Sequence, residues 1–336
     1  MATRRLTFLS FIGTYGIVTS AIFKGYPGRL NLSGSGYAFT TGPIKPTNLV
    51  TGSRFKPPRI VEIADQEKFW EGFNIYLNFS KEATAVGAYG FGDLNAIGND
   101  SFTFISSFIL PNMTSSEADT FLKPLYASFR AVGIEIEDSP AATVPYALTS
   151  AGTGDVPGSR LFSSRLFPSA NWDNPAAFNK MAAAIRRAVA EGGYLFRGRN
   201  IAPSLASAGD PGKSAAVNPA FRNSVMHATV FVQESIAGNT TPPEWFNLHD
   251  RLDGFMNVIR EATPGGGAYL NEADVLEPKW QESFFGSHYP RLAGIKKEVD
   301  PWGLFWVPTT PGSEAWEVVT DGGLPTQNGP LCRTRQ

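Results

Sequence analysis

The stretch that decides the fold is AYLNEAD, at residues 268–274. A run of aromatic, charged, glycine and proline residues follows it: Trp280, Phe285, Gly286, Arg291, Leu292, Lys296, Asp300, Pro301 and Phe305. The pattern predicts a strand and then two helical pieces, with Pro290 opening the second piece. PGGG at residues 264–267 marks the upstream boundary, because such a run ends a regular element. We therefore expect a carboxyl-terminal module at residues 265–316.

Strand and helix patterns alternate upstream of this module. Amphipathic spacing predicts four helices, at residues 66–77, about 114–132, 175–191 and 243–262. Thr114 or Ser115 is the expected cap of the second helix, and Asp173 or Asn174 that of the third. Apolar or alternating runs predict strands at residues 12–23, 83–91, 101–110, 193–197 and 228–233. This order predicts an α+β fold in which helices cover one face of a sheet.

Composition narrows the classes of partner. The 336 residues are 42% hydrophobic, which is enough for a substantial core. Basic and acidic residues number 29 and 30, so the chain has no basic field to attract nucleic acid or an anionic membrane. We therefore expect neither as a partner. Cys332 is the one cysteine, which excludes a disulfide within the chain.

The amino terminus allows two interpretations. Basic residues followed by the apolar residues 6–12 are typical of a secretory signal, whereas residues 12–23 also suit a buried β-strand, which we favour. Glycosylation sequons occur at Asn31, Asn78, Asn99, Asn112 and Asn239. They favour a secreted glycoprotein, with a cytoplasmic location as the alternative. The polar end from about Asp321 is expected to be disordered.

Familiar catalytic motifs are missing from the sequence. The three histidines, His227, His249 and His288, lie far apart and lack metal-ligand spacing, so we expect core-edge or surface histidines and no metal site. The sequence has neither a Gly-x-Ser-x-Gly elbow nor a P-loop. These observations alone indicate an α+β protein without an assigned chemistry.

Two blocks carry a family resemblance. GTYGIVTSAIF at residues 13–23 and the module described above together resemble the berberine-bridge-enzyme-like, FAD-linked oxidoreductases. The resemblance extends over residues 13–316. It implies an antiparallel sheet covered by helices as the substrate domain, with a remnant of the FAD-binding domain formed by the chain ends. The implied divisions are residues 1–27, the last strand of the FAD-binding domain; 28–264, the substrate domain; 265–316, the berberine-like module; and 317–336, a disordered tail.

The resemblance also implies a site for FAD. Its implied flavin contacts are Gly13, Thr14, Tyr15, Gly16, Ile17, Val18, Tyr269 and Asn271. Glu272 falls where several relatives carry a tyrosine base, and an apolar pocket would raise its pKa toward the working pH. It would take a proton from a small-molecule substrate while a hydride leaves for the flavin, which O2 then reoxidises. The alternative is that Glu272 only pairs with an arginine such as Arg222. Strand alternation would place Tyr269 and Asn271 on one face and Glu272 on the other.

The chain departs from the family at its amino-terminal end. The histidine and cysteine that usually attach FAD, and the glycine-rich phosphate loop, are not found, and the glycine run is reduced to residues 11–13. Two functions therefore stay open. One is FAD-dependent oxidation of an alcohol, sugar or secondary metabolite. The other is a truncated non-catalytic fragment, or a module that binds small molecules without flavin. A missing cofactor domain would leave apolar surface exposed on the sheet face that meets it.

Overall fold

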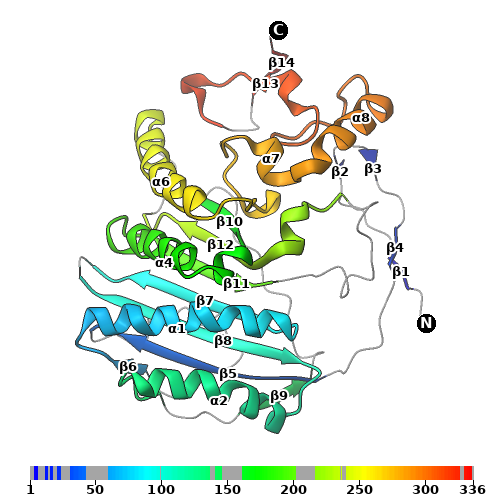
Figure 1. Ribbon diagram of the computed structural model, residues 1–336. Coiled ribbons are helices and arrows are strands. Elements are labelled where there is room, and N and C mark those ends of the chain that lie inside the picture. Colours follow the sequence, from blue (N-terminus) through cyan, green and yellow to red (C-terminus); the bar gives the residue numbers. More distant parts are fainter. Residues whose placement is uncertain are drawn as a thin grey trace.

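The computed structural model describes residues 4–6, 12–13, 16–17, 21–23, 31–42, 60–98, 100–136, 141–145, 161–201, 216–234, 236, 240–325 and 329–334. Its centre is an eight-stranded sheet of order β10-β12-β11-β7-β8-β5-β6, with β9 also paired to β5 (Figure 1). Every pairing in this sheet is antiparallel except that of β5 with β6. The strands are β5 (Asn31–Thr40), β6 (Ile60–Glu62), β7 (Tyr89–Ala96), β8 (Phe102–Pro111), β9 (Ala142–Pro145), β10 (Phe162–Pro168), β11 (Leu195–Asn200) and β12 (Ser224–Phe231).

The predicted helices are confirmed. They are α1 (Gln66–Ala85), α2 (Ser115–Ala131), α4 (Pro175–Ala190) and α6 (Pro242–Ala262), with the short α3 (Ala170–Asp173) ahead of α4. Thr114 caps α2 in a capping box with Glu117, and the Asn174 side chain accepts from the first turn of α4. These local hydrogen bonds explain why the starts of both helices could be predicted from the sequence.

One predicted strand is wrong. Residues 83–91 were expected to be extended, but α1 continues to Ala85 and β7 begins at Tyr89. Ala83 and Thr84 prolong the buried face of the helix, and Gly87 then reverses the chain at a positive φ of 78°. The strands predicted at residues 101–110, 193–197 and 228–233 correspond to β8, β11 and β12, although the ends of β11 and β12 are displaced by several residues. Strands β5, β6, β9 and β10 were not predicted.

Helices α1, α2 and α4 lie across one face of the sheet, and the carboxyl-terminal module lies at one end of it (Figure 1). Strand alternation turns Phe104 and Phe108 of β8 toward the helices. There they pack with Tyr76, whose ring centroid lies 4.8 Å from that of Phe104 and 5.8 Å from that of Phe108. The core is therefore an aromatic layer between the sheet and α1.

The carboxyl-terminal module contains the two predicted helical pieces, α7 (Trp280–Phe285) and α8 (Tyr289–Val299), joined by η5 (Gly286–His288). The strand predicted at its start is wrong. Residues Leu270–Glu272 form a 3₁₀ turn, η4, because the Glu272 N–H bonds back to the Tyr269 carbonyl at 2.9 Å. Strand alternation therefore cannot separate Asn271 from Glu272.

Exposed apolar side chains gather in this module and not on the sheet face where we expected them. Trp302 and Leu304 are 78% and 79% exposed, whereas Tyr89, the most exposed large apolar residue of the described sheet, is 38% exposed. The turn that carries them follows α8 and is fixed by Asp300. The Asp300 carboxylate accepts from Lys296 at 2.6 Å and from two backbone N–H groups at 2.9 Å.

The chain ends differ from two expectations. Residues 12–23 were predicted as one buried strand. The structure has instead short strands, in which β1 (Arg4–Leu6) pairs with β4 (Ala21–Phe23) and β2 (Ile12–Gly13) with β3 (Gly16–Ile17). The tail is not wholly irregular either, because β13 (Trp316–Val318) pairs with β14 (Leu331–Arg333). The turn η6 (Ser313–Ala315) precedes β13, and the turn η7 (Asp321–Gly323) lies between the two strands. Among the described residues, no helix is long and apolar enough to cross a membrane.

Candidate functional site

The candidate site lies on the face of the sheet that the helices leave free. On β11, Phe196 turns toward the helices, so its neighbours Arg197 and Arg199 turn to the opposite face. The antiparallel register places Arg197 opposite Asp93 of β7 and Arg199 opposite His227 of β12. Period-two alternation thus brings four titratable side chains from three strands onto one face.

Arg197 is locked in place. It donates to both carboxylate oxygens of Asp93, at 2.9 and 3.1 Å, in a bidentate pair. Its guanidinium also lies 5.5 Å from the ring centroid of Phe91 and 5.4 Å from that of Phe231. Both charged groups are buried, with 15% and 4% of their side chains exposed. This pair fixes the floor of the site.

Glu272 of the carboxyl-terminal module meets the second arginine. Arg199 NH1 lies 3.1 Å from Glu272 Oε1 and 3.4 Å from Oε2, and His227 Nδ1 lies 3.7 Å from Oε2. The side chains of Arg199 and Glu272 are 24% and 32% exposed, so the carboxylate is within reach of a bound molecule. We expected an apolar pocket around Glu272. This expectation is wrong, because the Arg199 guanidinium and the His227 imidazole face the carboxylate. An arginine partner was foreseen, but it is Arg199 and not Arg222.

His227 is a buried, neutral histidine. Burial, and then the positive charge of Arg199, lower its pKa to about 4. The nearby Glu272 carboxylate does not reverse this shift, since its charge is already paired with Arg199. Among the described residues, His227 Nε2 and Arg199 Nε are both buried without a hydrogen-bond partner. Each such group costs about 1–3 kcal/mol of stability, so this corner of the sheet is not optimised for stability alone.

The other predicted site residues of the module lie beside Glu272. The Tyr269 ring packs edge-on to Phe221 and to His227, with a centroid distance of 5.5 Å in each case. Asn271 is exposed, and its amide donates to the Tyr269 hydroxyl at 3.0 Å. Tyr269, Asn271 and Glu272 thus form one polar edge at the sheet, as a 3₁₀ turn and not as a strand.

The predicted amino-terminal flavin contacts are only partly described. Gly13, Gly16 and Ile17 belong to the β2–β3 pairing, for which the backbone alone is described. Thr14, Tyr15 and Val18 lie outside the described residues. Their role as flavin contacts stays a prediction.

The residues around Glu272 suit the ring of a flavin better than its diphosphate. The exposed Asn271 amide and the Tyr269 ring could meet the polar and flat parts of an isoalloxazine. In the part of the chain that the structure describes, we find no glycine-rich loop leading into a helix that could hold a diphosphate. Nor do the described residues group three or more metal-ligating side chains.

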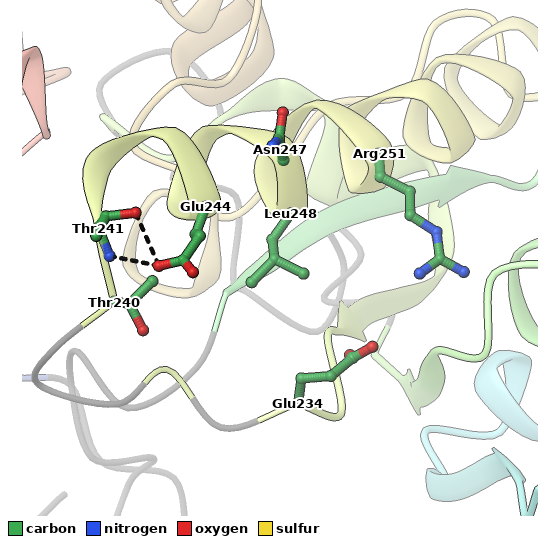
Figure 2. Close-up of a pocket in the computed structure, with 7 residues that line it drawn as sticks. All are labelled: Glu234, Thr240, Thr241, Glu244, Asn247, Leu248 and Arg251. Carbon is green, nitrogen blue, oxygen red and sulfur yellow. Dashed lines mark hydrogen bonds between the residues drawn. The ribbon is translucent and has the colours of Figure 1, made fainter.

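A hollow lies elsewhere, at the amino end of α6 (Figure 2). It has a volume of about 650 Å³ and is lined by Glu234, Thr240, Thr241, Glu244, Asn247, Leu248 and Arg251. Glu244 closes the helix cap with Thr241, at 2.7 and 2.8 Å, and Arg251 donates to the Gly192 carbonyl at 3.0 Å. None of the predicted site residues lines this hollow. Two of its charged side chains, Glu244 and Arg251, make hydrogen bonds within the local fold.

Sequence reasoning did not foresee Arg197, Asp93 or Arg199. The available pattern was Phe-Arg-Gly-Arg at residues 196–199, whose alternation puts both arginines on one face of a strand. His227 and His249 were expected at the core edge or the surface, whereas both are buried, at 1% and 7% exposure. His249 bonds the buried Asp274 at 2.8 Å and stacks on Trp245 at a centroid distance of 5.3 Å.

An antiparallel sheet with helices on one face and charged groups meeting a carboxyl-terminal module on the other is a fold that this chain shares with VAO-type flavoproteins. The crystal structure of the VAO-type flavoprotein MtVAO713 from Myceliophthora thermophila C1 has this fold, with a TM-score of 0.73 and 19% identity, and covers 96% of this chain and 54% of its own. Residues 268–310 match the family model Berberine and berberine like.

Curated relatives agree with the structural comparison. FAD-linked oxidoreductase ZEB1 of Gibberella zeae is 27% identical over 93% of this chain and 50% of its own length. An uncharacterized FAD-linked oxidoreductase of Arthroderma benhamiae is 30% identical over 80% of this chain and 49% of its own. The chain belongs to the berberine-bridge-enzyme-like, FAD-linked oxidoreductases. It spans about half the length of the curated relatives that it matches.

Proposed function

We propose that the chain supplies the substrate-binding half of an FAD-dependent oxidoreductase, in which Glu272 accepts a proton from a small organic substrate. The observation that carries this proposal is the position of Glu272. Its carboxylate is partly exposed, lies on the helix-free face of the sheet and contacts Arg199 at 3.1 Å. A general base must be accessible and held in place, and this carboxylate meets both conditions.

The proposed reaction is the oxidation of an alcohol, a sugar or a secondary metabolite. The substrate O–H proton passes to a Glu272 oxygen, its C–H bond gives up a hydride and a C=O bond forms. FAD, when bound, takes the hydride and passes two electrons to O2, which with two protons becomes H2O2. Tyr269 and Asn271 would contact the flavin ring, together with Gly13, Thr14, Tyr15, Gly16, Ile17 and Val18.

A secretory location belongs to the same proposal. Two of the five sequons have asparagines that are exposed in the described part of the chain, Asn78 on α1 and Asn112 after β8. Both could therefore accept a glycan, which would make the protein a secreted glycoprotein. Release of the glycans by an endoglycosidase would be seen as a loss of mass in protein from its native source.

The second candidate function is a binding module that takes small molecules without flavin. It is favoured by the partly exposed Arg199–Glu272 pair, which could bind a polar small molecule with or without flavin. Absorbance separates the two functions. Purified protein that gains flavin absorbance with added FAD, and keeps it through dialysis, supports the oxidoreductase. Protein that stays colourless supports the binding module.

Glu272→Gln tests the base. In a version that binds FAD, turnover should fall about 10²–10⁴-fold while the flavin absorbance is retained, because general base catalysis typically contributes this much. Glu67→Gln is the matched control, since Glu67 also pairs with an arginine, Arg186, but is exposed at the start of α1. Normal turnover in Glu272→Gln would remove Glu272 from the mechanism.

A further inference from the structure

The two arginines of β11 make unequal use of their hydrogen-bonding groups. Arg197 gives two donors to Asp93 and is held between the rings of Phe91 and Phe231. Arg199, two residues further along the same face, donates among the described residues only to Glu272, and only through NH1. Its Nε is buried and has no partner in that part of the chain. Arg197 is therefore built into the sheet, whereas Arg199 is committed to a single contact with the module.

His227 completes the surroundings of Glu272. It is paired with Arg199 across the β11–β12 register, and only 1% of its side chain is exposed. Its Nδ1 faces Glu272 Oε2 at 3.7 Å, outside hydrogen-bonding distance but with no side chain of the described residues bonded to it. A bare Nδ1 would set its lone pair against a carboxylate, which only accepts, so the single proton of the neutral ring belongs on Nδ1. Nε2 is then the nitrogen left unpartnered in the buried interior.

We infer that Arg199 is a positioning residue for Glu272, and that His227 supports it as a neutral Nδ1–H tautomer. The inference rests on the proposed function, since positioning matters for the reaction only if Glu272 is the base. Arg199 crosses from the rigid sheet to a 3₁₀ turn and fixes where the carboxylate lies. Neutral His227, with Nδ1 3.7 Å from the second oxygen, directs an N–H dipole toward it without adding another cation. The carboxylate thus stays partly exposed and ordered.

Nuclear magnetic resonance tests the contact without any cofactor. Protein labelled with ¹³C at glutamate carboxyl carbons gives the Glu272 resonance, which is assigned by its loss in Glu272→Gln. In Arg199→Gln this resonance should shift and broaden at pH 7, and Arg199→Lys should restore it in part, because lysine keeps the charge but not the planar donor pair. Arg186→Gln, which breaks the distant Arg186–Glu67 pair, should leave it unchanged.

The imidazole ¹⁵N spectrum tests the tautomer, with His227 assigned by its loss in His227→Gln. We expect the proton on Nδ1 at pH 7. In Arg199→Gln the pKa of His227 should rise, since the positive charge of Arg199 is one of the two causes that lower it. A proton on Nε2, or a Glu272 resonance that is unmoved in Arg199→Gln, would overturn the inference.

Turnover then separates this inference from the proposed function. In a version that binds FAD, Arg199→Gln should lower kcat about 10²-fold with little change in KM, as a displaced catalytic group does, and Arg199→Lys should recover part of the loss. A normal kcat in Arg199→Gln, with Glu272→Gln inactive, would overturn the positioning role and leave the base in place. Normal turnover in Glu272→Gln would instead reject the base, whatever the spectra show.

Discussion

The two faces of the central sheet are made from the same strands and have opposite characters. The face under α1 carries Phe104 and Phe108 in an aromatic layer that is closed to solvent. The opposite face carries Arg197, Arg199 and His227, with two nitrogens that lack partners among the described residues. Because successive side chains of a strand point to opposite faces, one strand can pack against the helices on one side and carry charged groups on the other. Substitutions at adjacent positions of a strand should therefore have unrelated effects.

The largest expected effect is on the aromatic face. Phe104→Ala removes a fully buried ring that contacts Phe39, Phe73 and Tyr76, and should lower the free energy of unfolding by about 3–5 kcal/mol. Ile105→Val, at the next position and on the other face, should cost only about 0.5–1.5 kcal/mol. Denaturant titration followed by tryptophan fluorescence measures both. Equal losses would contradict the division of roles between the faces.

The second effect separates the two arginines of the charged face. Arg197→Gln removes the charged partner of the Asp93 carboxylate, whose side chain is 4% exposed, and should cost about 3–5 kcal/mol. Arg199→Gln breaks a partly exposed pair and should cost at most about 1 kcal/mol. The same denaturant titration applies. If Arg199→Gln were the more destabilising change, Arg199 would be a structural residue of the sheet.

Local signals in the sequence were enough for most of the fold. The capping residues Thr114 and Asn174 and the apolar rows of α4 and α6 are encoded within a few residues, and the helices were predicted correctly. The end of α1 and the turn at residues 270–272 were not. The run that begins at Ala83 mixes helix formers with strand formers, and only the packing of Ala83 against the core shows that the helix extends through it. Tyr269 looks like a strand residue, but its neighbours close a 3₁₀ turn at the sheet.

The site could be predicted only in part, for a related reason. Family resemblance pointed to Glu272, Asn271 and Tyr269, which lie together. The partner of Glu272 depends on how β11 and β12 pair with each other and how the module lies on them, which is information far apart in the sequence. Arg222 was as reasonable a partner as Arg199 from the sequence, and only the strand register distinguishes them.

The third effect is a pH dependence at the contact between α6 and the module. The hydrogen bond that His249 donates to the buried Asp274 carboxylate raises the pKa of His249 above 6.5, although burial opposes the shift, and the charges of Asp274 and Asp253 and a hydrogen bond to Asp250 add to the rise. The folded pKa exceeds the unfolded one, so this pair stabilises fully below about pH 6.5 and loses its contribution as pH rises through the folded pKa.

His249→Gln should therefore flatten the stability profile. The variant loses a charge-assisted hydrogen bond, typically about 1.5–3 kcal/mol, mostly on the acid side of neutrality. The unfolding midpoint of the native chain should fall as the pH rises above about 6.5, and that of the variant should change less over the same range. A native midpoint that is level across this range would show that the His249–Asp274 pair makes no pH-dependent contribution.

The smallest expected effect on stability concerns the module's exposed turn. Trp302 and Leu304 are mostly exposed, so Trp302→Ser with Leu304→Ser should change the free energy of unfolding by no more than about 0.5 kcal/mol. Leu292→Ala in the same module, where Leu292 is 3% exposed, should cost about 2–5 kcal/mol. Binding of an apolar fluorescent dye should fall in the double variant, because the two side chains form the most exposed apolar surface of the described chain.

This experiment decides between the sheet face and the module as the apolar surface of the chain. The turn is held by the Asp300 carboxylate. Burial alone would raise the pKa of Asp300, but the hydrogen bonds that it accepts from Lys296 and from the N–H groups of Phe305 and Leu304 lower this pKa to about 2. The turn should thus keep its shape from neutral pH down to about pH 3, and dye binding should be constant over that range. Dye binding that survives the double variant would place the apolar surface on the helix-free face, beside Glu272.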